Sequence, residues 1–166
     1  MAFEIERKFL VKGEDWRSFV RVQTVIRQGY LASGDRSSTR VRIADGRRAT
    51  VTIKSKGAEL RRLEVECGIS VPDAEALLSL RQTSLIEKVR HEVEWQGSTW
   101  EIDVFSGENA GLVIAEIELE HEHDHFARPP WLAAEVTGQA RYYNGSLARH
   151  PYSEWSMLPP RRMAAS

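Results

Sequence analysis

Alternating charged and apolar residues are the feature that most constrains the fold of this chain. In residues 3–11, the two-residue repeat of a β-strand sends Glu4, Glu6 and Lys8 to one face and the apolar residues to the other. Taken alone, this pattern predicts an ordinary half-buried strand with its charges in water.

The same pattern recurs in six later segments. This recurrence argues against an ordinary strand whose charges lie in water. The solvated face of an antiparallel sheet usually mixes Thr, Ser, Gln and Lys, whereas here nearly every such face is ionic. A face of this kind needs a charged partner. Its recurring members are Arg40 and Arg42; Lys54 and Lys56; Arg62, Glu64 and Glu66; Lys88 and Arg90; Glu101 and Asp103; and Glu116, Glu118 and Glu120.

Composition limits the class of protein. The 166 residues fit one domain, 1–166, with a loop-like tail over about 151–166. The net charge of -1 gives no broad basic field for nucleic acid or a membrane. The single cysteine, Cys67, excludes a disulfide framework and is expected to be a buried thiol. With neither a signal-like N-terminus nor a membrane-length apolar run, we expect a soluble, cytoplasmic protein.

Eight strands and three helices are predicted. Asp45-Gly46 and Gln96-Gly97-Ser98 are hairpin signals, so the strands on either side of each should pair antiparallel. The helices are expected to cover the outside of the sheet. The strands lie near 3–11, 25–31, 39–44, 48–55, 61–69, 86–95, 99–104 and 113–120, and the helices near 14–22, 72–82 and 138–148.

The predicted fold class is mainly β with flanking helices (α+β), as a closed eight-stranded antiparallel barrel. Two arrangements are open. If the apolar faces point inward, the helices have little to pack on; if the charged faces point inward, the helices cover the apolar outside. The number of helices favours the second arrangement, a tunnel with a charged interior. Such an interior is costly to desolvate, so it must stay wet or hold ions.

Carboxylates beside cations suit a metal-chelated polyphosphate. Mg²⁺ usually reaches proteins through a few carboxylates plus substrate phosphates, and guanidinium and ammonium groups bind the remaining phosphate oxygens. Without a metal, the carboxylates would repel one another. The expected cofactor is therefore Mg²⁺ or Mn²⁺.

In this respect the chain resembles the CYTH superfamily, also called triphosphate tunnel metalloenzymes. The resemblance implies a closed eight-stranded tunnel that hydrolyses or cyclises triphosphates with a divalent metal. It begins with the Glu-x-Glu-x-Lys triplet of residues 4–8 and continues, in family order, through Gln28-Gly29-Tyr30-Leu31, Arg40-Val41-Arg42, Thr52-Ile53-Lys54, Glu64-Val65-Glu66, Lys88-Val89-Arg90, Glu101-Ile102-Asp103 and Ala115-Glu116-Ile117-Glu118-Leu119.

The resemblance also implies roles for individual residues. Lys56 and Arg62 are weaker candidates for substrate binding, and Tyr30 is a candidate to orient water or a lysine, with a packing role as the alternative. The implied metal-binding set is Glu4, Glu6, Glu64, Glu66, Asp103, Glu116 and Glu118. The implied triphosphate-binding and catalytic set is Lys8, Arg40, Arg42, Lys54, Lys88 and Arg90, with Tyr30 added for catalysis.

The expected activity is hydrolysis of inorganic tripolyphosphate to pyrophosphate and phosphate. The class IV adenylate cyclases of the superfamily carry a His-Phe pair upstream of the triplet, but only Met1, Ala2 and Phe3 precede Glu4 here. Cyclisation of ATP, hydrolysis of thiamine or nucleoside triphosphates, and a non-catalytic polyphosphate-binding module are the alternatives. The general base is unassigned, and the oligomeric state is open between a monomer and a homodimer.

Two further features are interpreted structurally. His121, His123 and His125 alternate in a polar connection, which favours a solvated loop over a transition-metal site. The tryptophans favour packing over stacking with bases.

Overall fold

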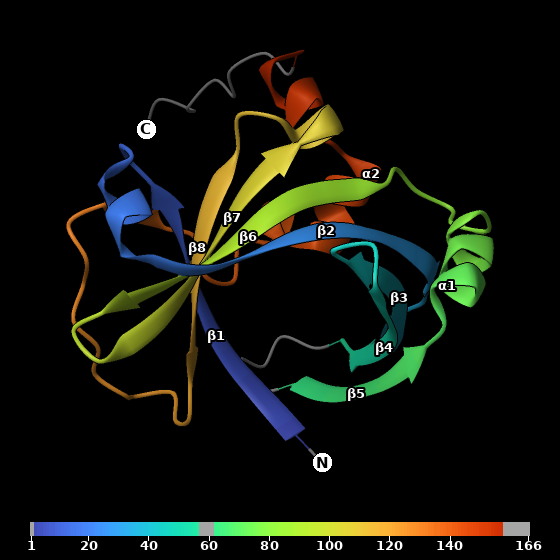
Figure 1. Ribbon diagram of the computed structural model, residues 1–166, viewed down its shortest axis with the longest axis horizontal. Helices are drawn as coiled ribbons and strands as arrows, with labels where there is room; N and C mark the ends of the chain where they lie inside the picture. Colours follow the sequence, from blue (N-terminus) through green and yellow to red (C-terminus); the bar gives the residue numbers. More distant parts are fainter. Residues whose placement is uncertain (1, 57–61, 158–166) are drawn as a thin grey trace, which may run out of the picture.

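The computed structural model describes residues 2–56 and 62–157, without the side chains of residues 2–4, 62, 156 and 157. Nine antiparallel strands form one sheet in the order β5-β4-β3-β2-β6-β7-β8-β1-β9 (Figure 1). The strands are β1 (Ala2–Val11), β2 (Val20–Ser33), β3 (Ser37–Ala44), β4 (Arg48–Ser55), β5 (Arg62–Ile69), β6 (Ile86–Trp95), β7 (Ser98–Ser106), β8 (Val113–Leu119) and β9 (Leu132–Glu135).

The sheet curls so that strands at opposite ends of the order meet. β1 pairs with β8 along most of its length, and its first residues also pair with β5 in the register Ala2↔Glu64, Phe3↔Leu63 and Glu4↔Arg62. The prediction of a mainly β, antiparallel fold is confirmed. Full closure as an eight-stranded barrel goes beyond this short pairing and stays a prediction. The ninth strand, β9, was not predicted.

Both predicted hairpins are confirmed, and both use left-handed backbone. In the β3–β4 turn, Asp45 and Gly46 have φ values of 52° and 64°, and in the β6–β7 turn, Gln96 and Gly97 have 45° and 81°. Two consecutive residues with positive φ match the right-handed twist of the flanking strands. These turns set the register of the two strand pairs.

The helical segments are shorter than predicted. The first is a 3₁₀ helix, η1 (Asp15–Phe19), because Val20 and Val22 already belong to β2. The second, α1 (Val71–Leu78), packs on Val41, Ile43 and Ala49 outside the sheet. The remaining helical segments are α2 (Asn144–Arg149) and the 3₁₀ helices η2 (Gly107–Asn109), η3 (Ala140–Tyr142) and η4 (Tyr152–Met157).

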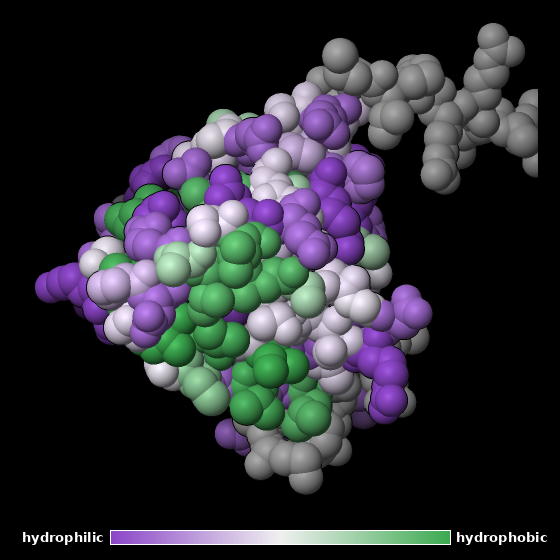
Figure 2. Space-filling model, turned by 90° about the vertical axis from the view of Figure 1, so that its right-hand side faces the viewer, coloured by the Kyte–Doolittle hydropathy of each residue, from purple (hydrophilic) through white to green (hydrophobic). Residues whose placement is uncertain are grey.

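Most of the apolar packing lies outside the sheet, as the tunnel arrangement requires. One cluster joins Phe9 and Trp100 on the outer faces of their strands to Trp16 and Trp131, which confirms the packing role expected of these tryptophans. The outer faces of β4 and β5 are less covered: Ile53 is 48% exposed and Val65 51% exposed. Figure 2 shows apolar residues gathered on this side of the molecule.

The expectation that all helices cover the outside of the sheet is wrong for the third helix, α2. Ile86, Phe105 and Ile114 lie two residues from Lys88, Asp103 and Glu116, so they share the inner face. These three apolar side chains pack against Leu147 and Ala148 of α2. The inner face is therefore apolar at this end, and α2 packs against it there.

No helix in the described part of the chain is long and apolar enough to cross a membrane.

Candidate functional site

The charged inner faces of the strands line a cavity of about 440 Å³. Because residues two apart on a strand share a face, the alternating charges of the sequence converge here. Tyr30 and residues of the C-terminal segment complete the lining. The predicted residues that it brings together are Glu6, Lys8, Tyr30, Arg40, Arg42, Lys54, Lys56, Glu64, Glu66, Lys88, Arg90 and Glu116, and Glu101 joins them. The side chains of Glu4 and Arg62 lie outside the described part of the structure.

A second cavity, of about 490 Å³, is acidic. Glu118, Glu120 and Asp124 line it, and it shares Glu6, Glu101 and Glu116 with the first cavity. The two cavities therefore adjoin at three carboxylates. One side of this junction is rich in cations and the other in carboxylates.

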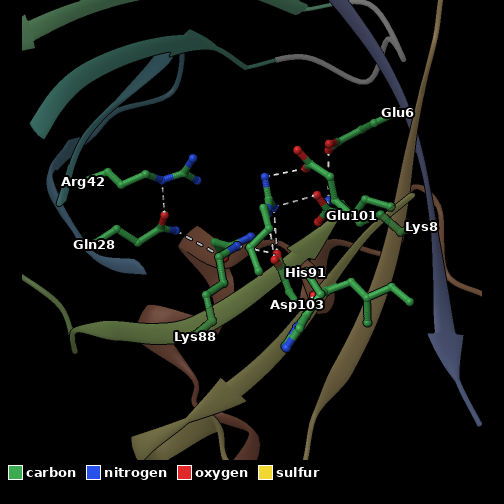
Figure 3. A network of polar contacts seen from close by, with 12 residues as sticks. Glu6, Lys8, Gln28, Arg42, Lys88, His91, Glu101 and Asp103 are labelled. Atoms are coloured by element: carbon green, nitrogen blue, oxygen red, sulfur yellow. Dashed lines mark hydrogen bonds and ion pairs between the residues drawn. The ribbon is translucent and has the colours of Figure 1, made fainter. Parts of the chain in front are cut away.

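Asp103 is fully buried at the centre of an ion cluster (Figure 3). Its Oδ2 accepts a hydrogen bond from Lys88 Nζ at 2.5 Å, and Arg90 binds both of its oxygens at 2.7 and 2.8 Å. Burial opposes the carboxylate form, but the charges of Arg90 and Lys88 outweigh it and hold the pKa of Asp103 far below its usual range. Both oxygens of Asp103 are thus occupied by cations.

The pKa of Lys88 is lowered, whereas pairing with a carboxylate usually raises the pKa of a lysine. Burial disfavours its ammonium form, Asp103 favours it, and Arg90 repels it, because Arg90 shares the same carboxylate. The pKa of Lys88 is lowered to about 8 as a result. Lys88 therefore loses its proton more readily than an ordinary lysine.

Lys8 holds two carboxylates at the junction of the cavities. Its Nζ lies 2.5 Å from Glu116 Oε1 and 3.0 Å from Glu6 Oε1. Burial opposes the charge of Lys8, but Glu116 and Glu6 outweigh it and raise its pKa. In turn, Lys8 and Arg90 overcome the burial of Glu116 and lower its pKa to about 2. Both partners stay ionised at neutral pH.

Two site residues were missed at the sequence level, Gln28 and Asn144. Asn144 Oδ1 accepts hydrogen bonds from Lys88 Nζ at 3.0 Å and from Gln28 Nε2 at 3.2 Å, and Gln28 Oε1 accepts one from Arg42 Nε at 2.9 Å. Gln28 lies two residues from Tyr30 and therefore shares the inner face with it, so the strand alternation could have indicated it. Asn144 begins α2, far along the chain, and no strand pattern indicates it.

Glu101 was placed on an ionic strand face together with Asp103 but was given no role in the site. It faces the cavity junction and pairs with Arg90 Nη1 at 2.5 Å. Burial raises its pKa, Arg90 opposes that shift, and the neighbouring carboxylate of Glu116 adds to it.

The predicted acidic residues on β5 lie against cations. Glu64 Oε2 is 3.1 Å from Lys54 Nζ. Glu66 Oε2 accepts a hydrogen bond from Thr52 Oγ1 at 2.8 Å and lies 3.7 Å from Arg40 Nη2. These two carboxylates line the cation-rich cavity and not the acidic one.

The remaining carboxylates fit a hard divalent cation by their chemistry. Glu6 lies directly across from Glu118, and Glu101 across from Glu116, so like charges face each other on neighbouring strands. Such pairs destabilise a sheet unless a cation offsets them. No three His, Cys, Asp or Glu side chains of the described residues already form a metal-binding group.

The histidine and cysteine expectations have different outcomes. His121, His123 and His125 are exposed, and His121 contacts Asp124 within its own turn, so the solvated-loop interpretation is confirmed. The expectation of a buried thiol is wrong, because Cys67 is exposed. It lies on the outer face of β5, while α1 contacts β2, β3 and β4.

Together, the fold and the cavities define a class: an antiparallel sheet protein whose ionic inner face suits a small polyanion and cations. The chain belongs to the CYTH domain family, whose model matches residues 2–152.

Several known proteins resemble the chain over most of its length. It is 41% identical to an inorganic triphosphatase of Acetivibrio thermocellus, over 93% of this chain and 99% of that protein. It is 37% identical to an inorganic triphosphatase of Nitrosomonas europaea, over 87% and 96% of the two chains. A crystal structure of an inorganic triphosphatase superposes with a TM-score of 0.64 at 34% identity, covering 89% of this chain and 95% of the other.

Proposed function

We propose that this protein is a metal-dependent triphosphatase that hydrolyses inorganic tripolyphosphate to pyrophosphate and orthophosphate. One observation carries the proposal: a cation-lined cavity of about 440 Å³ adjoins an acidic one at Glu6, Glu101 and Glu116. This arrangement suits a polyphosphate bound together with a metal. The names of the two relatives at 41% and 37% identity support the same activity.

The proposed site lies inside a closed tunnel. The pairing of β1 with β5 supports closure, because it joins the two sides of the curled eight-stranded wall. We also propose that residues 1–166 form one such domain.

The triphosphate is bound by the cations of the first cavity. Arginine binds phosphate oxygens in pairs, and lysine acts as a point charge. Burial and repulsion from Arg40 and Arg90 lower the pKa of Arg42 to about 10, which still leaves it charged at neutral pH. A bound anion relieves this repulsion. The proposed set is Lys8, Arg40, Arg42, Lys54 and Arg90. Lys88, which the family resemblance includes in this set, is assigned a different role below.

The metal, Mg²⁺ or Mn²⁺, is assigned to the junction carboxylates Glu6, Glu116 and Glu118, with one or two of them binding it together with phosphate oxygens. Glu101 lies beside these carboxylates, and Glu4, whose side chain lies outside the described structure, stays in the proposed metal-binding set on the family resemblance. When bound, the metal offsets charge on the phosphate oxygens and polarises the phosphorus for attack. We place Asp103 outside this metal-binding set, as a positioning residue, because it is fully buried, lines neither cavity, and binds Lys88 and Arg90 with both oxygens. Glu64 and Glu66 likewise position Lys54 and Arg40.

Lys88 is the proposed general base. A neutral amine has two N–H groups, which match its two acceptors, Asp103 Oδ2 and Asn144 Oδ1, and its lone pair is then free for a water proton. Water oxygen attacks the terminal phosphorus in line, the bridging P–O bond breaks, and the water proton passes to Lys88 Nζ. Pyrophosphate leaves, with its new charge offset by the surrounding cations. Burial raises the pKa of Tyr30, so it remains a protonated phenol beside the substrate.

Turnover tests the proposal. Purified protein is incubated with tripolyphosphate, ATP or thiamine triphosphate and Mg²⁺ or Mn²⁺, and the products are identified. Equal amounts of pyrophosphate and orthophosphate from tripolyphosphate are expected. Cyclic AMP from ATP would replace the proposal with a cyclase, and binding without products would replace it with a binding module.

Variants connect the activity to the site. Glu4→Gln and Arg42→Ala are expected to remove most activity while the fold is kept. Glu135→Gln serves as the control, because Glu135 pairs with Arg7 away from both cavities. Wild-type rates in both site variants would contradict the assignment.

A further inference from the structure

Two cations converge on one serine hydroxyl at the cation-rich cavity. Lys56 Nζ donates a hydrogen bond to Ser33 Oγ at 2.6 Å, and Arg149 Nη1 donates one to the same oxygen at 3.2 Å. Ser33 ends β2, Lys56 follows β4, and Arg149 ends α2. Three segments that are distant in sequence therefore bring two positive charges to one neutral group.

Nothing in the described part of the chain neutralises this pair. Neither Lys56 nor Arg149 forms an ion pair with a described carboxylate, and both are exposed at the cavity lining. Like charges this close repel each other unless an anion lies between them. The two side chains therefore present a site for an anion.

A neighbouring hydroxyl adds a second polar group without a partner. Thr83 Oγ1 is buried, has no hydrogen-bond partner and lines the same cavity. The next residue, Ser84, donates its backbone N–H to Ala148 O at 3.0 Å, which holds Thr83 beside the end of α2. On the other side, Lys56 N donates to Arg36 O at 2.8 Å. The backbone thus fixes both sides of this region.

The position of these residues indicates which part of a ligand they would contact. Lys56 lies two residues beyond Lys54 on the inner face, a rise of about 6.6 Å along the chain. Ser33, Lys56, Thr83 and Arg149 line the cation-rich cavity but not the acidic one. Lys56 and Arg149 are exposed, whereas Lys8 and Lys88 are buried, so the pair lies on the solvent side of the inner cations.

We infer that Lys56, Arg149, Ser33 and Thr83 form an outer phosphate subsite that holds one phosphate group beyond the three of the proposed substrate. This inference rests on the proposed function for the inner three positions. The phosphate group has two possible sources, the next unit of a longer linear polyphosphate or free orthophosphate.

Equilibrium binding without divalent metal tests the subsite independently of turnover. Calorimetric titrations give Kd values for tripolyphosphate, tetrapolyphosphate and orthophosphate with the wild type, Lys56→Gln, Arg149→Gln and the double variant. Arg47→Gln is the matched control, because Arg47 is exposed in the β3–β4 turn, at the opposite end of this hairpin from Ser37 and Ser55. The readout is the ratio of the Kd for tetrapolyphosphate to that for tripolyphosphate.

The double variant is expected to raise this ratio about tenfold, and the control to leave it unchanged. An unchanged ratio with about tenfold weaker orthophosphate binding supports the subsite and assigns it to free phosphate. An unchanged ratio without weaker orthophosphate binding overturns the subsite, whether the two polyphosphates are weakened equally or not at all. Failure of the proposed function is a separate result, seen as no hydrolysis of tripolyphosphate by the wild type with Mg²⁺ or Mn²⁺.

Discussion

Asp103 shows how one buried carboxylate organises the cations around it. It is fully buried and bound by Lys88 and Arg90. Asp103→Asn would leave two cations close together without their shared counter-charge. We expect the free energy of unfolding to fall by about 3 kcal/mol in urea titrations at neutral pH.

The control for this prediction is Glu135→Gln, which removes a partly exposed ion pair with Arg7. It should cost less than about 1 kcal/mol. A loss from Asp103→Asn no larger than this control would show that the buried cluster is not organised as described.

The lowered pKa of Lys88 sets the pH dependence expected of the activity. If its free amine accepts the water proton, kcat/KM should fall about tenfold per pH unit below a pKa of about 8 and level off above it. The measurement is kcat/KM for tripolyphosphate from pH 6 to 9.5 at saturating metal. A flat profile across this range would exclude Lys88 as the base.

Among the helical elements, α1 gives a test of stability separate from function. Ser70 Oγ accepts a hydrogen bond from Asp73 N at 3.1 Å and caps the helix, which packs on the outer face of the sheet. Ser70→Ala should lower the free energy of unfolding by about 1 kcal/mol, and Ser70→Gly by only a few tenths. Chemical denaturation measures both, and equal losses would contradict the cap.

The strands could be predicted from the sequence because charged and apolar residues alternate along each of them. The same alternation also placed Arg42 and Lys88 on the inner face. The elements that local pattern does not specify were missed. β9 has four residues and gains its place by pairing with β1. Asn144 reaches Lys88 only because α2 packs on the apolar end of the inner face. Likewise, the two-residue alternation alone could not separate Asp103, which lines neither cavity, from Glu116, which lines both.

For the whole molecule, the facing carboxylates predict stabilisation by metal. Glu6 faces Glu118 and Glu101 faces Glu116, so a bound divalent cation relieves repulsion in the folded state alone. At 100 times Kd, binding adds about 2.7 kcal/mol, which corresponds to a Tm increase of about 5–10 °C. Thermal unfolding with millimolar Mg²⁺ or Mn²⁺ measures it. Glu118→Gln should reduce the shift, and an unchanged wild-type Tm would count against the metal site.

Hydrolysis of tripolyphosphate in ¹⁸O-labelled water tests the central claim most directly. Attack of water on the terminal phosphorus places one labelled oxygen in orthophosphate and none in pyrophosphate. Mass spectrometry of the products, with Mg²⁺ or Mn²⁺ present, should show this distribution in equal amounts of the two products. Label in pyrophosphate, or no products from tripolyphosphate, would contradict the account.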